Sequence, residues 1–269
     1  MALSAAFAGV AGLSAPLAAQ EAVAVELFTS QGCAACPPAD ALLGEISVRD
    51  DVVALGMHVD YWNYLGWSDT LGAAANSRRQ RDYAAALGER MVYTPQMVID
   101  GATALVGARR GAVLDAIARA GARPRTVALE VAPEGDMIRI AAHARAPGAA
   151  REAADEAADE AADEVAEEVA DIVYFIYDRP QTVAIARGEN AGREITYVNP
   201  VRAWMALARW DGAPGVWRVP APEGARGVAV LAQAASDGRV LGAAKHEFRR
   251  DAAAPPFTGV ADTGAPTHE

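Results

Sequence analysis

Two cysteines, Cys33 and Cys36, are the residues of this sequence best suited to chemistry, and the 269 residues contain no others. An apolar, β-prone run precedes them, and a run with helical character, residues 37–46, follows. A strand that delivers Cys33 to the first turn of a helix places it where free backbone N–H groups and the helix dipole favour negative charge. That environment lowers the pKa of the thiol and favours the reactive thiolate. The pattern predicts a dithiol–disulfide redox pair.

The cysteine pair also allows two other interpretations. A zinc site needs four ligands, and the sequence offers no further cysteine and only four histidines, none in a paired spacing. We therefore expect no metal centre and no cofactor. An inert structural disulfide is the second alternative, although a bridge that closes so short a loop constrains the unfolded chain little.

The elements expected around the cysteines alternate between strand and helix. Residues 51–59 are almost continuously apolar, as in a buried parallel strand, so the first three elements form a βαβ unit. The next helix carries Arg78, Arg79 and Arg81, which we expect on a solvated face. Asp100-Gly101 indicates a hairpin turn. The later elements are a helix, two strands and a helix over residues 76–87, 96–99, 104–106 and 110–120.

An aromatic segment follows the second strand, at residues 58–72. Tyr61, Trp62, Tyr64 and Trp67 fall within seven residues, and His58 ends the strand itself. Open α/β sheets place their ligand sites at such strand ends. Trp62 and Trp67 are therefore candidate substrate-binding residues, and His58 is a candidate proton donor for the cysteines. The alternatives are a loop pinned by aromatics and a structural histidine.

The order of these elements resembles the thioredoxin arrangement. The matching pieces are the strand, C-x-x-C and helix, together with Thr94-Pro95 at the start of the third strand. The resemblance implies a cis proline that borders the substrate groove and packs against the redox pair, so Thr94 and Pro95 are candidate substrate-binding residues. We therefore expect an α/β, thioredoxin-like fold with a helical insertion over residues 21–122.

A closer resemblance rests on the strings ELFTSQGCAACPPAD, HVDYWNYLGWSD, RQRDY, VYTPQMVIDG and GENAGREITYVNPVRAW. Together they are similar to the secreted bacterial thioredoxin-like family called domain of unknown function 1223. The resemblance implies a fold and an exported location, but no established reaction. Unlike thioredoxin, the chain has Ala34-Ala35 between the cysteines and Gly32, not Trp, before them, so no reduction potential is carried over.

The second half of the chain predicts a mostly antiparallel β subdomain over residues 123–250, because short alternating segments are separated by frequent turns. Residues 152–170 form an acidic, low-complexity insertion whose like charges recur every four residues, which predicts a solvated loop. Residues 251–269 are rich in Ala and Pro and predict a disordered tail. The expected strands are residues 126–131, 137–144, 171–177, 181–187, 193–199, 215–219, 227–233 and 240–246.

Charge and the first residues bear on location and partners. The net charge is −11, but the acidic insertion accounts for most of it, and no basic patch argues for nucleic acid. Residues 1–20 resemble a secretory signal peptide that ends in Leu-Ala-Ala, without the usual leading positive charge. This run is too short and weakly apolar for a stable membrane span. We expect a periplasmic or secreted protein.

The leading functional hypothesis is thiol–disulfide oxidoreduction on a protein or small thiol/disulfide substrate. Cys33 would be the nucleophile and Cys36 the residue that resolves the mixed disulfide. One alternative is copper binding through Cys33, Cys36 and His58, since thiolates and imidazole suit Cu(I). The other is a non-catalytic binding protein whose aromatic segment holds the ligand.

Overall fold

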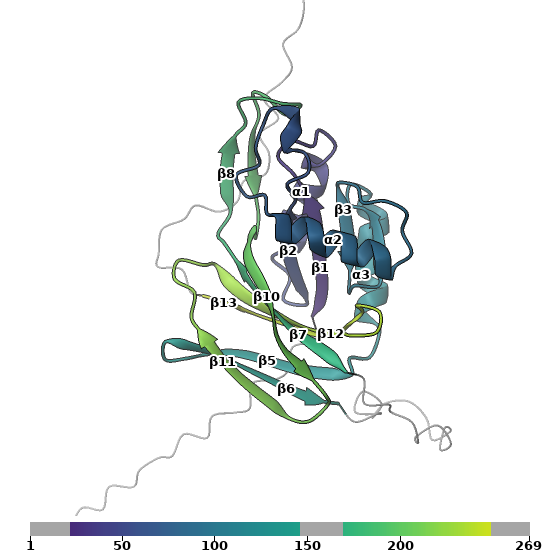
Figure 1. Cartoon of the computed structure of the whole chain (residues 1–269), viewed down its shortest axis with the longest axis vertical. Coiled ribbons are helices and arrows are strands. Elements are labelled where there is room, and N and C mark those ends of the chain that lie inside the picture. Colours follow the sequence, from purple (N-terminus) through teal and green to yellow (C-terminus); the bar gives the residue numbers. More distant parts are fainter. Residues whose placement is uncertain (1–21, 146–168, 249–269) are drawn as a thin grey trace, which may run out of the picture.

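A computed structural model of the chain describes residues 22–145 and 169–248 (Figure 1). The expected signal peptide, the expected tail and almost all of the acidic insertion lie outside the described residues. The cysteines belong to a mixed sheet with strand order β2-β1-β3-β4, in which β1 runs parallel to β2 and antiparallel to β3. Its strands are β1 (Val23–Thr29), β2 (Val52–His58), β3 (Gln96–Ile99) and β4 (Thr103–Val106).

Two helices cover one face of the mixed sheet. Helix α1 (Pro37–Ile46) begins with two prolines, which suit a first turn whose N–H groups have no partner within the helix. Helix α3 (Arg110–Gly121) lies beside it. The buried cluster between helices and sheet includes Leu43 of α1, Ile117 of α3 and Leu27 of β1.

An antiparallel sheet, with strand order β10-β7-β12-β13, covers the opposite face of the mixed sheet. Phe175 and Leu231 of this sheet share a buried cluster with Phe28 of β1 and Leu55 of β2. Helix α2 (Ala74–Ala86) adds Tyr83 to the same cluster. The strands are β7 (Ala170–Tyr177), β10 (Val201–Trp210), β12 (Gly227–Ala234) and β13 (Val240–Glu247).

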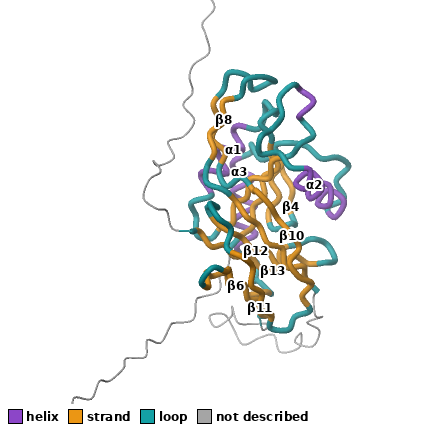
Figure 2. Tube along the Cα trace, turned by 60° about the vertical axis from the view of Figure 1, so that its left-hand side comes forward, coloured by secondary structure: helices purple, strands orange, loops and turns teal. Residues whose placement is uncertain are grey.

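A third sheet packs on the far side of the antiparallel sheet, so β7, β12 and β13 are largely buried, whereas the edge strand β10 is largely exposed. It contains β5 (Val127–Glu134), β6 (Met137–Ala144) and β11 (Gly215–Pro220), in the order β11-β6-β5. The helices are confined to the half of the molecule that holds the mixed sheet, and strands fill the other half (Figure 2). The two remaining strands, β8 (Gln181–Ala184) and β9 (Glu194–Tyr197), form a separate hairpin.

The predicted α/β, thioredoxin-like fold class is wrong, because the described chain is mainly β. It has thirteen strands in four sheets and three α-helices within residues 22–145 and 169–248. The physical reason is the second face of the mixed sheet. In a doubly wound α/β fold helices cover both faces, whereas here a sheet from the second half of the chain covers most of one face.

Helix α2 holds a buried ion pair against β1, so one arginine expected on a solvated face is instead buried. The Arg79 guanidinium binds both carboxylate oxygens of Glu26, through Nε at 2.5 Å and Nη2 at 2.8 Å. Tyr83 and Gln233 complete its hydrogen bonds. A buried charge of this kind is tolerated only when it is paired in this way. The pair therefore fastens α2 to the mixed sheet.

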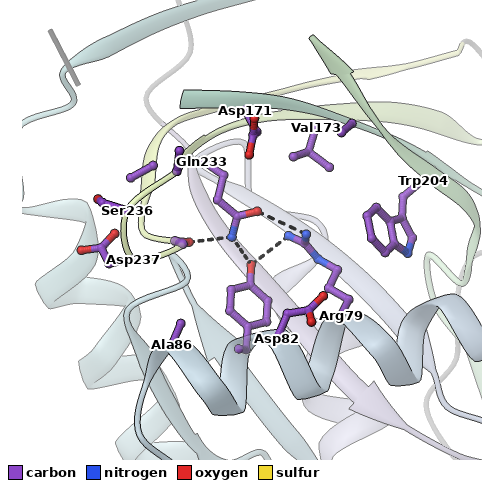
Figure 3. A pocket seen from close by; sticks show the side chains of 14 residues that line it. Arg79, Asp82, Ala86, Asp171, Val173, Trp204, Gln233, Ser236 and Asp237 are labelled. Carbon is purple, nitrogen blue, oxygen red and sulfur yellow. Dashed lines mark hydrogen bonds between the residues drawn. The ribbon is translucent and has the colours of Figure 1, made fainter. Parts of the chain in front are cut away.

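A partly open cavity of about 330 Å³ lies beside this ion pair, between α2 and the antiparallel sheet. Figure 3 shows Gln233 between Arg79 and the turn after β12, and Asp82, Asp171 and Asp237 are among the residues that line the cavity. The Gln233 amide donates to Tyr83 at 2.9 Å and to the Gly238 carbonyl at 2.6 Å. The polar side chains of Arg79, Tyr83 and Gln233, which line the cavity, thus already form hydrogen bonds within the protein.

None of the helices in the described part of the chain is both long enough and apolar enough to cross a membrane.

Candidate functional site

The two cysteines form a disulfide in the loop between β1 and α1, with their Cα atoms 5.4 Å apart. Cys36 is the N-cap residue of α1 and already has helical backbone angles. The Cys33 side chain is 3% exposed and Cys36 is fully buried, while Ala34 and Ala35 between them are exposed. Both cysteines are therefore buried, Cys36 slightly more than Cys33, and the role of Cys33 as the first to react stays a prediction.

One helical turn after Cys36, α1 carries a buried carboxyl group, Asp40. The Asp40 N–H donates to the Cys36 carbonyl at 3.1 Å, so the two residues stand in helical i, i+4 register. Side chains in that register lie on one helix face, with Cβ atoms about 5–6 Å apart. Asp40 is 4% exposed, and its Oδ2 has no hydrogen-bond partner. Burial raises the pKa of Asp40 to about 7, although the charge of His58 and the Thr29 hydroxyl oppose the shift.

His58 and Asp69 form a buried pair close to Asp40, at the carboxyl end of β2. His58 Nδ1 lies 2.8 Å from Asp69 Oδ2, and both side chains are almost fully buried. Burial opposes ionisation of Asp69, but hydrogen bonds from His58 and from the N–H groups of Gln31 and Leu71 hold the pKa of this carboxyl below its usual range. Because an ionised carboxylate only accepts, Nδ1 of His58 carries the proton.

Tyr197, from the end of β9, closes this cluster. Its ring meets the His58 ring edge-to-face, with centroids 4.7 Å apart. Burial raises the pKa of Tyr197 far above its usual value, and the charges of Asp40 and Asp69 add to the shift. Asn199, in a left-handed conformation (φ 48°), fixes this segment to β2 through hydrogen bonds with the Ala54 carbonyl and the Gly56 N–H, each 2.9 Å.

The hairpin loop between β8 and β9 also forms hydrogen bonds with the cysteine loop. The Asn190 side-chain amide donates to the carbonyl oxygens of Gln31 and Cys33, each at 2.9 Å, and Asn190 is 1% exposed. The neighbouring Glu189 carboxylate accepts a hydrogen bond from the Ala34 N–H at 3.3 Å. Residues more than 150 positions away in the sequence thus hold the backbone on both sides of Cys33.

Trp62, Thr94 and Pro95 come together beside the cysteine loop. Trp62 Nε1 donates to Thr94 Oγ1 at 2.7 Å, and a Cβ placed on Gly32 would lie 3.3 Å from the Trp62 Cβ. The Thr94-Pro95 bond is cis, as the resemblance implied. Trp62 therefore links Gly32, the residue before Cys33, to Thr94, the residue before the cis proline.

Trp67 belongs to the other side of the loop. Its Nε1 donates to the Gln31 side-chain carbonyl at 2.8 Å, and its Cβ lies next to Gly188. Gln31 in turn bonds to Thr70 and, through its backbone N–H, to Asp69. The indole of Trp67 thus joins the aromatic segment, the cysteine loop and the β8–β9 loop.

The copper alternative, with Cys33, Cys36 and His58 as ligands, stays a prediction. Cys33 and Cys36 are bonded to each other, and His58 is engaged by Asp69. Among residues 22–145 and 169–248, no three or more His, Cys, Asp or Glu side chains gather in a group that could hold a metal ion. His143 lies on β6 and His246 on β13, which belong to other sheets than the one that carries the cysteine loop.

Sequence reasoning missed four polar residues of this site, Asp40, Asp69, Glu189 and Asn190. Asp40 carried a usable signal, since it follows Cys36 at the i+4 spacing of a predicted helix. The other three lie within strings quoted above for the family resemblance, but nothing in their spacing indicates contact with the cysteines. Their placement depends on how the β8–β9 hairpin folds back onto the first half of the chain.

Taken together, the fold and the site define a mainly β protein with a disulfide at the amino end of a helix, above a buried cluster of acids and one histidine. The chain belongs to the family described as "Protein of unknown function (DUF1223)", whose sequence pattern matches residues 24–233.

Two solved structures are similar to this chain. Protein AGR_C_4864 from Agrobacterium tumefaciens is 34% identical, with a TM-score of 0.68 over 89% of this chain and 100% of that one. HBP35 of Porphyromonas gingivalis is 11% identical, with a TM-score of 0.54 over 90% of this chain and 81% of that one, and at this identity the likeness concerns the fold alone. No curated protein matches the sequence.

The buried carboxyl of Asp40 predicts a pH dependence of stability. In the folded protein the Asp40 carboxyl keeps its proton up to about pH 7, whereas an unperturbed Asp carboxyl loses its proton near pH 3.8. The contribution of this carboxyl to the free energy of unfolding is therefore fully present below its pKa in the unfolded chain. It is lost as the pH rises through its pKa in the folded protein, by up to about 4 kcal/mol. Urea unfolding of oxidised protein from pH 4 to 8 should show Asp40→Asn gaining stability relative to wild type as the pH rises.

The matched control is Asp50→Asn, which removes an exposed carboxyl just beyond the same helix. Its difference from wild type should stay within about 0.5 kcal/mol across this pH range. If the Asp40→Asn and wild-type curves run parallel, the carboxyl of Asp40 is ionised at ordinary cost and the assignment is wrong.

Proposed function

We propose that the protein is a thiol–disulfide oxidoreductase that uses the Cys33–Cys36 pair. The observation that carries the proposal is the disulfide at the N-cap of α1 with a proton-accepting carboxyl, Asp40, on the same helix face as Cys36. Burial raises the pKa of Asp40 to about 7. General bases work best with a pKa near the operating pH.

The exchange runs in two balanced steps. In the first, the Cys33 thiolate attacks one sulfur of a substrate disulfide, the substrate S–S bond breaks, and the departing thiolate takes a proton from solvent. In the second, Cys36 gives its proton to Asp40, and its sulfur attacks Cys33. This step releases the second substrate thiolate and restores the Cys33–Cys36 bond. The substrate gains two electrons and the protein loses two; the reverse sequence oxidises a substrate dithiol.

The substrate wall in this proposal is formed by Trp62, Thr94 and Pro95, which lie together beside the cysteine loop. An extended peptide disulfide could pair with the backbone at Thr94 as an added strand. We assign Trp67 a positioning role, since its indole is bonded to Gln31. His58 would act on the cysteines through Asp40, because its own Nδ1 is held by Asp69.

Trapping of the mixed disulfide tests the proposal. Reduced Cys36→Ser protein, treated with oxidised glutathione or a disulfide-bonded peptide, should accumulate one adduct on Cys33, because the resolving thiol is gone. Cys33→Ser is the matched control and should form adducts at least about tenfold more slowly, since Cys36 has no exposed surface. Intact mass measured over time gives both rates.

Equal rates for the two variants would refute the assignment of Cys33 as the nucleophile. If neither variant forms adducts while the reduced protein stays folded, the pair is an inert structural disulfide and the proposal is wrong.

The proposal includes export to the periplasm or beyond, where a disulfide persists. Its support is the resemblance of residues 1–20 to a signal peptide with a cleavage site after Ala18 or Ala19. The mass of the protein recovered from the periplasmic or secreted fraction should correspond to a chain that begins at Ala19 or Gln20. A full-length mass in the cytoplasmic fraction would refute export.

A further inference from the structure

The β8–β9 hairpin supplies a charged group to a cysteine loop that precedes it by more than 150 residues. Its loop places Glu189 against the Ala34 N–H, inside the C-x-x-C segment. Asn190, the next residue, binds the carbonyl oxygens of Gln31 and Cys33. The function proposed above makes no use of Glu189.

The position of Glu189 is set by its neighbours. Asn190 is buried, and its side-chain oxygen accepts a hydrogen bond from Arg193 at 3.1 Å. Gly188 has a left-handed backbone (φ 80°) and contacts Trp67, so the loop turns at that point against the aromatic segment. The Ala191 N–H closes this turn onto the Gly188 carbonyl at 3.1 Å. Glu189 thus stands between two anchored residues, with its carboxylate directed at the cysteine loop.

The Ala34 N–H lies directly after Cys33 and two residues before the N-cap of α1. A backbone N–H that donates a hydrogen bond to an anion favours the anionic form. Here this N–H is already bound by a carboxylate. A negative charge next to Cys33 also disfavours a second negative charge on its sulfur.

We propose that Glu189 is a positioning residue that sets the reactivity of Cys33, holding the C-x-x-C loop while its charge disfavours the Cys33 thiolate and so favours the disulfide. The inference rests on the proposed redox role of the pair. It assigns a tuning function to a residue from the second half of the chain.

Other charged groups surround the pair and must be held constant in any test. Asp40 lies on the helix face of Cys36, with His58 and Asp69 behind it and Tyr197 closing the cluster. These groups belong to α1, β2, the aromatic segment and β9. Arg193 stands on the far side of Asn190. Glu189 differs from all of them because its carboxylate touches the C-x-x-C segment itself.

The experiment measures the alkylation rate of Cys33 by iodoacetamide as a function of pH, in full-length protein that also carries Cys36→Ser. Glu189→Gln keeps an oxygen acceptor for Ala34 but removes the charge. We expect the midpoint of its pH profile to move down by about half a pH unit, with a rate roughly threefold higher at pH 7. Glu189→Lys should move it further, and 0.5 M salt should shrink both shifts.

Glu194→Gln is the matched control, because it removes the same charge from β9 of the same hairpin, opposite Ala184. Its profile should coincide with that of the parent protein. Coincident profiles for Glu189→Gln and the parent, or equal shifts for Glu189→Gln and Glu194→Gln, would overturn the inference. Alkylation needs no turnover, so a pair that fails to exchange with substrates would refute the proposed function without deciding the role of Glu189.

Discussion

The structure depends on a network of buried hydrogen bonds at the carboxyl ends of β1 and β2. Burying an amide, a carboxylate or an imidazole without a partner costs far more than an ordinary contact contributes. His58 Nδ1 is therefore bonded to the Asp69 carboxylate, which also accepts a hydrogen bond from the Gln31 N–H. The carbonyl oxygens of Gln31 and Cys33 accept hydrogen bonds from the Asn190 amide. The cysteine loop is fixed because it supplies several of these partners.

This network explains why the second half of the chain belongs to the site. Asn190 reaches the cysteine loop and Tyr197 reaches His58 from a hairpin that Asn199 fastens to β2. The antiparallel sheet that follows then covers the face of the mixed sheet that α1 and α3 leave free, with Phe175 and Leu231 packed on β1 and β2. Site and fold are thus held by the same long-range contacts.

Local elements could be predicted well where local physics decides them. The helix that begins at Pro37 and the strand Gln96–Ile99 were predicted with their observed bounds, since prolines, periodicity and turn residues mark them. Strand β10 (Val201–Trp210) was missed because its Ala, Leu, Met and Arg residues favour helix, and only pairing with β7 overrides that preference. Arg79 was misplaced because its partner, Glu26, lies on a strand 53 residues away.

The fold class and half of the site could not be predicted for the same reason. Which sheet covers which face, and which loop touches Cys33, are decided by contacts between distant segments that leave no periodic signal. Cys33, Cys36, Trp62, Thr94 and Pro95 could be nominated from motifs. Asp69, Glu189 and Asn190 could not be placed beside them without the hairpin that carries two of the three.

The reduction potential of the Cys33–Cys36 pair tests the central claim most directly. Purified full-length protein would be equilibrated in glutathione and dithiothreitol buffers, and the oxidised fraction measured by thiol labelling. A redox-active pair should have a potential within the range of dithiol oxidoreductases, about −120 to −270 mV, and the charge of Glu189 should place it toward the more negative end. A potential well below about −300 mV would mean a disulfide that resists exchange, and would contradict the account.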